Sequence, residues 1–156
     1  KLNDKITILP ISLSEVTKIS DFNMSNIEIG GSISSFSENY KHDGKNLETI
    51  FKYKTLGISG YDLIKSFQLK QPKYLKIDVD GIEHLILEGA SKILVNEKIK
   101  SLSIEINENF SEQYEKALKI MHNNNFKILH KKHNEKLFNQ NSKFSKTFNY
   151  IFVREK

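Results

Sequence analysis

The chain has 156 residues, which is the length of one ordinary domain. It contains no cysteine, which excludes disulfide frameworks, zinc ribbons and thiol nucleophiles, and no apolar run approaches the roughly 20 residues that a membrane-spanning helix needs. Lys and Arg number 24 against 19 Asp and Glu, for a net charge of +5, but the basic residues are spread along the whole chain and predict no nucleic-acid partner.

The first half of the chain carries weak secondary-structure signals. Residues 6–11 alternate and are rich in β-branched side chains, which predicts a strand, and Pro10 lacks an N–H, so this strand should lie at a sheet edge. Residues 30–37, rich in Gly and Ser, indicate a flexible polar loop; the alternative for residues 32–37 is a segment that shapes a ligand pocket. A weak strand is expected over residues 50–54 and a short helix over residues 60–69.

The centre of the chain has the clearest pattern. Residues 74–81 predict a strand that ends in acidic residues and a glycine. From Ile82 to Leu94, apolar residues then repeat at helical spacing for about three turns. Gly89 lies inside this predicted helix, where it costs about 1 kcal/mol relative to Ala, a cost compatible with a helix that packs close to a sheet. Residues 101–106 alternate between polar and apolar side chains and predict the next strand.

The last third of the chain continues this rhythm. Ser111 is the predicted N-cap of a helix that ends at residues 123–125. Residues 126–129 and 148–153 predict two strands joined by a polar loop, and the second is apolar on both faces, which is typical of a strand in the middle of a covered sheet. The sequence therefore predicts a single α/β domain over residues 1–156, with parallel strands followed by a C-terminal antiparallel hairpin.

Acidic residues gather at the end of the central strand. Asp78 and Asp80 end that strand, Glu83 lies one turn into the following helix, and Glu105 closes the next strand. In open α/β sheets, ligands bind beyond the carboxyl ends of the strands. Acids gathered there repel one another unless a cation, shared protons or a lysine offsets them, and Lys76 is placed to face Asp78. The pattern indicates a functional site; the alternative is that Asp80 and Glu83 only stabilise the N-terminus of the helix.

Two alternative functions follow from these features. The Asp-x-Asp-Gly sequence resembles the motif of haloacid dehalogenase-like phosphohydrolases, in which Asp78 would be the nucleophile and Asp80 the general acid/base. Ile82 stands where that motif has threonine, and no later pair of adjacent acids supplies the magnesium site. The second alternative, which the net positive charge leaves open, is a non-catalytic basic binding module.

A closer similarity is to the FkbM-type S-adenosylmethionine-dependent methyltransferases. It is carried by residues 75–83, which end in Asp-Val-Asp-Gly-Ile-Glu, by Leu-Glu-Gly-Ala at residues 87–90 and by Ser-Ile-Glu-Ile at residues 103–106. Three further segments resemble the end of that family's third strand, the stretch before its fourth-strand motif and its closing strand: residues 11–15, 56–64 and 149–154.

The resemblance implies part of a class I methyltransferase (Rossmann-like) sheet, with strand order 3-2-1-4-5-7-6 and helices on both faces. The third strand of that fold is an edge strand, in agreement with Pro10, and the seventh inserts antiparallel between the fifth and the sixth. The implied cofactor is S-adenosylmethionine. Ser12 and Leu13 would border its adenine, and Asp78 would lie near its methionine end and the transferring methyl group.

The implied reaction is methyl transfer to an oxygen of a small hydroxylated acceptor such as a saccharide. Asp78, Glu83 and Glu105 are the candidate catalytic residues. Glu83 and Glu105, with Asp80 or Lys76, would face the acceptor, align it and provide a general base. We expect no metal centre, although carboxylates at adjacent strand ends offer the oxygen ligands that magnesium or calcium takes.

The glycine-rich cofactor loop of the family has no counterpart in the sequence, because no Gly-x-Gly precedes an apolar helix. We therefore expect the chain to be the C-terminal two-thirds of such an enzyme, lacking an N-terminal segment of the same polypeptide and binding S-adenosylmethionine poorly by itself. Without the first two strands of the fold, residues 6–11 would lack their native neighbour. The chain begins at Lys1 with no secretory signal after it, and we expect a cytoplasmic enzyme.

Overall fold

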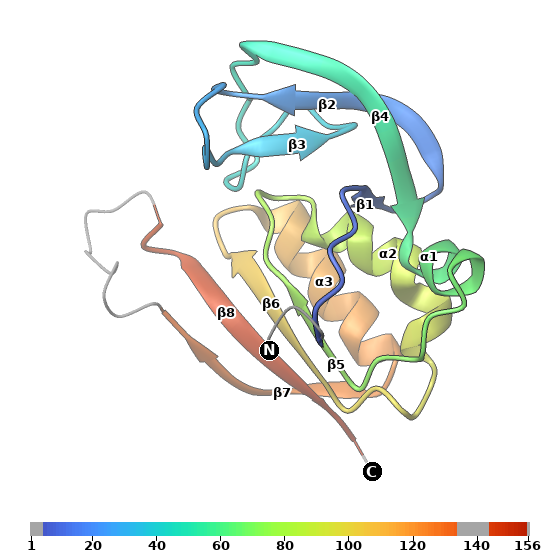
Figure 1. Ribbon diagram of the computed structural model, residues 1–156. Coiled ribbons are helices and arrows are strands. Elements are labelled where there is room, and N and C mark those ends of the chain that lie inside the picture. Colours follow the sequence, from blue (N-terminus) through green and yellow to red (C-terminus); the bar gives the residue numbers. More distant parts are fainter. Residues whose placement is uncertain (1–4, 134–143, 156) are drawn as a thin grey trace.

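The computed structural model describes residues 5–133 and 144–155, which form a mixed α/β structure with two four-stranded sheets (Figure 1). The α/β class predicted from the sequence is confirmed. No helix in these residues is long and apolar enough to span a membrane. The polar loop expected before the last strand falls mostly on residues 134–143, outside the described residues.

The first sheet has the strand order β1-β4-β2-β3. Strand β1 pairs parallel with the end of β4, whereas β2 pairs antiparallel with both β3 and β4. The strand predicted over residues 50–54 is confirmed and extends further than expected. The bounds of these strands are Ser12–Ser14 for β1, Lys18–Met24 for β2, Ser34–Phe36 for β3 and Phe51–Ser59 for β4.

The strand predicted over residues 6–11 is wrong. This segment has no strand structure, and its apolar side chains Ile6 and Ile8 are exposed. No described strand lies beside it to accept its backbone hydrogen bonds, so alternation alone does not make it a strand. A strand does form directly after this segment: β1 begins at Ser12. It lies at the edge of its sheet, the position that Pro10 suggested.

The second sheet has the order β5-β6-β8-β7. Strands β5 and β6 are parallel, and β8 lies between β6 and β7 and is antiparallel to both. The parallel pair and the C-terminal antiparallel hairpin are therefore confirmed; the complete Rossmann-like strand order stays a prediction. The bounds are Tyr74–Ile77 for β5, Ser101–Asn107 for β6, Phe126–Lys132 for β7 and Thr147–Arg154 for β8.

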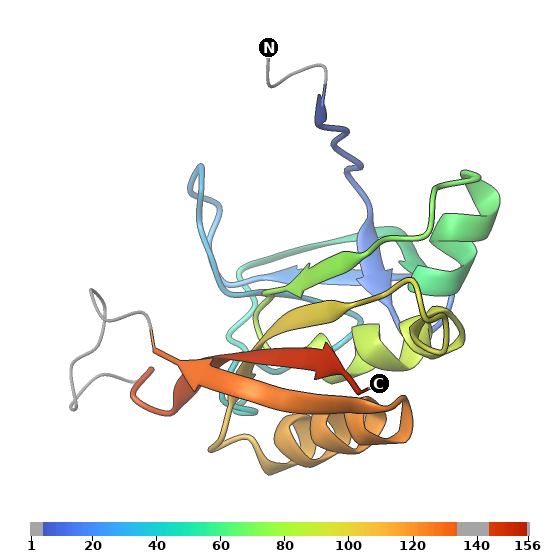
Figure 2. The same ribbon diagram turned by 90° about the horizontal axis from the view of Figure 1, so that it is seen from below.

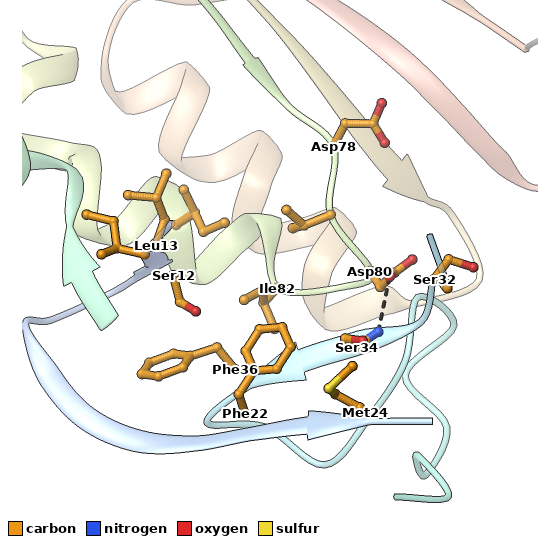
Figure 3. Close-up of a pocket in the computed structure, with 14 residues that line it drawn as sticks. Ser12, Leu13, Phe22, Met24, Ser32, Ser34, Phe36, Asp78, Asp80 and Ile82 are labelled. Atoms are coloured by element: carbon orange, nitrogen blue, oxygen red, sulfur yellow. Dashed lines mark hydrogen bonds between the residues drawn. The ribbon is translucent and has the colours of Figure 1, made fainter. Parts of the chain in front are cut away.

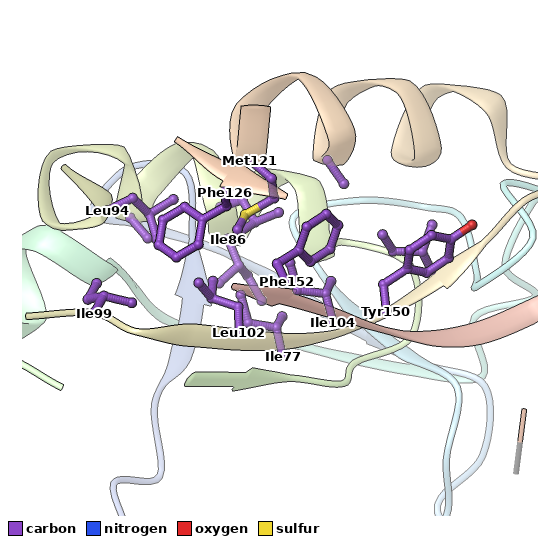
Figure 4. Packing of buried hydrophobic residues seen from close by; sticks show 14 of the residues in the cluster. Ile77, Ile86, Leu94, Ile99, Leu102, Ile104, Met121, Phe126, Tyr150 and Phe152 are labelled. Atoms are coloured by element: carbon purple, nitrogen blue, oxygen red, sulfur yellow. The ribbon is translucent and has the colours of Figure 1, made fainter. Parts of the chain in front are cut away.

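Helices α2 and α3 cover one face of the second sheet, while α1 lies beside α2 (Figure 2). Their buried faces pack on alternate residues of the sheet, such as Leu102, Ile104 and Phe152, to form the core (Figure 4). Within the described residues no helix covers the opposite face, which explains why Ile151 and Val153 of β8 are only half-buried. The helices span Gly60–Ser66 for α1, Glu83–Leu94 for α2 and Ser111–Asn123 for α3.

The predicted N-cap of α3 is wrong by one position. Phe110 occupies the cap, and Ser111 is the first helical residue. The Phe110 ring is buried against Tyr40 and His84, with ring centroids 5.2 and 5.8 Å away, so packing fixes this helix start where a polar cap was expected.

Gly89 shows why α2 can lie close to the first sheet. A Cβ atom at this position would overlap the Ser14 carbonyl oxygen of β1 and press on the backbone of Glu15. The glycine therefore lets the helix contact the strand backbone directly, in agreement with the expectation of close packing on a sheet. This contact holds β1, and with it Ser12 and Leu13, in position.

Gly89→Ala tests this contact. Alanine favours the helix by about 1 kcal/mol, but overpacking costs about 1–3 kcal/mol or more, so the free energy of unfolding in urea should fall. Ser91→Ala, on the exposed side of the same helix, is the matched control and should stay within about 0.5 kcal/mol of the parent. A Gly89→Ala protein as stable as the parent would show that α2 does not rest on β1.

Candidate functional site

The turn between β5 and α2, residues 78–82, is tightly fixed by its neighbours. Gly81 has φ 114°, a conformation that L side chains rarely adopt, and a Cβ there would lie 2.8 Å from the Lys41 carbonyl oxygen. Only glycine fits this position, for steric and conformational reasons together. The turn consequently brings Asp78 and Asp80 to the end of β5 in a defined arrangement.

Glu83 anchors this turn from inside the protein. Its side chain is 1% exposed; one carboxylate oxygen accepts the Val79 N–H at 3.1 Å, and the other accepts a hydrogen bond from the Gln113 side chain. Gln113 in turn accepts the backbone N–H of Asn107 at 2.8 Å. Burial raises the pKa of Glu83 to about 8, because the charged form loses its hydration there. Glu83 thus connects the turn to α3 and to the end of β6.

A pocket of about 580 Å³ lies between this turn and the first sheet (Figure 3). Phe22, Met24 and Phe36 form an apolar wall on the side of β2 and β3, and Ile82 faces them from the turn. The remaining lining comes from β1, from the turn and from the segment before β3, and includes Ser12, Leu13, Asp78, Asp80, Gly31, Ser32 and Ser34. The volume lies in the range of small-molecule sites, which are mostly apolar with a few polar groups.

The structure brings together some of the predicted site residues. Ser12, Leu13 and Asp78, the residues expected to bind the cofactor, all line this pocket although they come from separate elements. Glu83 does not line it, because its buried carboxylate faces Gln113. Glu105 lies outside the pocket lining as well, one strand further along the sheet.

Lys76, Asp78 and Glu105 share the face of the second sheet that α2 and α3 leave uncovered. Lys76 forms an ion pair with Asp78, as their positions on one strand predicted. Ile77 pairs with Ile104, so the residues that follow them, Asp78 just after β5 and Glu105 within β6, are neighbours. Strand β6 continues to Asn107, two residues beyond Glu105, which the sequence had placed at the strand end. Partial burial, and next the charge of Asp78, raise the pKa of Glu105 to about 7. Glu105 therefore exchanges its proton near neutral pH.

Sequence reasoning missed the apolar wall of the pocket. Phe22 and Met24 alternate with a single residue between them, and Phe36 follows a Ser-rich run, so neither segment showed a usable period. Of the two interpretations of residues 30–37, the structure favours the pocket: β3 forms there, and Ser32, Ser34 and Phe36 line the cavity.

His84, the residue after Glu83, lies in the interior of the protein. It is fully buried, edge-on to the Phe110 ring, and neither ring nitrogen meets hydrogen-bond geometry with a described residue. Burial lowers its pKa to about 4, so the ring is neutral and packs as part of the core. Among residues 5–133 and 144–155, no three His, Asp or Glu side chains gather in a way that could hold a metal ion.

Glu83→Gln tests the buried carboxyl group. The Glu83 pKa is about 4.5 in the unfolded chain and about 8 in the folded protein. Between these two pH values the folded protein holds the proton and the unfolded chain does not. Its contribution therefore makes the free energy of unfolding fall by about 1.4 kcal/mol per pH unit across this window. The variant should lack this part of the slope in urea titrations between pH 5 and 8, while Glu105 contributes equally to both proteins. Equal slopes would contradict a raised pKa at Glu83.

Comparison with known proteins identifies the family. The model of the methyltransferase FkbM domain matches residues 3–128, well over half of the chain. The match includes the turn, the pocket and β6, and it ends in β7, so the similarity of residues 149–154 to the family's closing strand stays a prediction. No curated protein and no solved structure matches the chain. The chain belongs to the FkbM methyltransferase domain family.

Proposed function

We propose that this chain takes part in S-adenosylmethionine-dependent O-methylation of a small hydroxylated molecule such as a saccharide. The observation that carries the proposal is the pocket, which joins Ser12, Leu13 and Asp78 from β1 and the end of β5 in a member of a methyltransferase family. S-adenosylmethionine, when bound, supplies an electrophilic methyl group on a positively charged sulfur.

The lining of the pocket suits such a ligand. Leu13, Phe22 and Phe36 offer apolar surface for a flat aromatic base, and the Ser12 hydroxyl is available to its polar edge. At the other end of the pocket, the Asp78 carboxylate is partly exposed and forms an ion pair with Lys76. A second cation can therefore approach Asp78 from the pocket, and the carboxylate would stabilise it through charge.

Glu105 is the proposed general base. It lies in β6 beside Asp78, and its pKa of about 7 matches the requirement that a base be partly deprotonated and still basic at neutral pH. In the proposed step, Glu105 takes the proton of the acceptor hydroxyl as the oxygen forms its bond to the methyl carbon. The electron pair of the broken carbon–sulfur bond stays on sulfur, which becomes neutral.

Glu83 has a different role in this proposal from the one first expected. Because its two carboxylate oxygens are occupied by Val79 and Gln113 inside the protein, we assign it the positioning of the turn that carries Asp78. Contact with the reacting groups is assigned to Asp78 on the cofactor side and to Glu105 on the acceptor side.

The observations do not favour the alternative functions. A phosphohydrolase needs Asp80 as a free general acid, but its carboxylate accepts two backbone N–H groups, from Ile33 and Ser34. The family match also supports methyl transfer over a non-catalytic basic module.

Asp78→Asn in the full-length gene product should weaken S-adenosylmethionine binding, measured by calorimetry, by about 10- to 100-fold. This range corresponds to the loss of one charged contact of about 1.5–3 kcal/mol. Glu97→Gln, an exposed carboxylate beyond the C-terminal end of α2, is the control and should bind like the parent. Absence of binding in the parent protein would overturn the proposed cofactor.

Glu105→Gln should leave cofactor affinity unchanged and lower kcat by about 10²- to 10⁴-fold, the usual contribution of a general base. In the parent, kcat/KM should rise with pH through an apparent pKa near 7, because the base acts in its deprotonated form. This rise should be absent from the variant. An unchanged pH profile in Glu105→Gln would assign the base to another residue.

A further inference from the structure

The Asp80 carboxylate ties two distant segments of the chain together. Its Oδ2 atom accepts the backbone N–H of Ile33 at 2.6 Å and that of Ser34 at 3.2 Å. Figure 3 shows the second of these bonds. Asp80 belongs to the turn after β5, whereas Ser34 is the first residue of β3 and Ile33 directly precedes it. Two successive N–H groups that converge on one anion form a backbone nest, so the contact is charge-assisted on both bonds.

The nest depends on an unfavourable backbone conformation. Ile33 has φ 65°, in the left-handed region that β-branched residues strongly avoid. Such a conformation persists only where the surroundings hold it. The two hydrogen bonds to Asp80 stabilise this conformation, because they require both N–H groups to point the same way.

The segment that Asp80 holds is a wall of the pocket. The cavity is lined on this side by Gly31, Ser32 and Ser34. The rest of the connection between β2 and β3 projects into solvent, where Ile27 and Ile29 are exposed. That connection is stabilised mainly by its own bonds, such as the one from the Asn26 side chain to the Ser32 carbonyl oxygen at 3.0 Å. Among the hydrogen bonds of the described residues, those of Asp80 join this wall to the turn that carries Asp78.

We infer that Asp80 is a positioning residue, which fixes residues 31–34 against the pocket and thereby sets how tightly the pocket holds its ligand. The inference rests on the proposed function for the identity of that ligand, S-adenosylmethionine. Asp80 acts on binding through Oδ2, which accepts both backbone N–H groups, while the proton transfer is assigned to Glu105. Removal of the carboxylate frees Ile33 to leave the left-handed region and the wall to move away.

The first test needs no ligand. Amide hydrogen exchange of the full-length protein is compared for the parent, Asp80→Ala, Asp80→Asn and Asp43→Asn. The exchange of Ile33 and Ser34 should accelerate at least about tenfold in Asp80→Ala and less in Asp80→Asn, which keeps an acceptor oxygen without the charge. Asp43 also accepts a backbone N–H, from Lys45 at 3.2 Å, but away from the pocket, and its variant should leave Ile33 unchanged.

Unchanged exchange at Ile33 and Ser34 in Asp80→Ala would overturn the inference. An equal acceleration at the core amides of Leu102 and Ile104 would also overturn it, because it would show general destabilisation in place of a local release.

The second test separates positioning from catalysis. Asp80→Ala should raise KM for S-adenosylmethionine about tenfold with kcat within about twofold, and Asp80→Asn should recover part of the affinity. A fall in kcat with unchanged KM would place Asp80 in the chemical step and contradict the inference. If the parent protein bound no S-adenosylmethionine, the proposed function would fail, while the exchange experiment would still decide whether Asp80 holds the wall.

Discussion

The hydrogen bond from the Val79 N–H to the buried Glu83 carboxylate holds the strand-to-helix turn on which the site depends. It closes a short loop over residues 79–83 around Gly81, whose backbone lies against Lys41. Because Glu83 is also bonded to Gln113, the turn is fixed relative to α3 as well as α2. A shift of this turn would move Asp78 away from its neighbours and would pull the wall held by Asp80.

Three carboxylates within six residues serve three tasks because their surroundings differ. Asp78 is exposed and paired with Lys76, Asp80 accepts backbone N–H groups, and Glu83 is buried with an amide partner. Each environment offsets the negative charge in its own way, or removes it by raising the pKa. This arrangement explains how a chain of net charge +5 concentrates acids at one edge of a sheet without severe self-repulsion.

Much of the second half could be predicted from sequence because its signals are local. The helical spacing of α2, the alternation in β6 and the two-faced apolar pattern of β8 each depend on neighbouring residues, and all three elements formed as expected. The position of β8 between two strands followed from the same pattern. The acidic turn was found for a similar reason, since Asp78 and Glu83 lie in one short motif.

The first half resisted prediction because its structure depends on distant contacts. Residues 6–11 alternate like a strand but have no described partner, while β3 forms from a Ser-rich run because β2 accepts it and Asp80 holds its start. The apolar wall of Phe22 and Phe36 exists only after this pairing. Glu83 is a similar case. From its spacing in the motif we expected it near the reacting groups, because spacing alone cannot show that α3 supplies Gln113 as a buried partner.

We propose above all that the pocket between the β5–α2 turn and the first sheet binds S-adenosylmethionine. The most direct measurement is a titration of the ¹⁵N-labelled full-length protein with S-adenosylhomocysteine, the demethylated form of the cofactor, followed by amide chemical shifts. We expect the largest amide shifts at residues that line the pocket: Ser12, Leu13, Ser34 and Val79. Shifts that are absent, or that centre on residues 96–100 at the far end of α2, would contradict it.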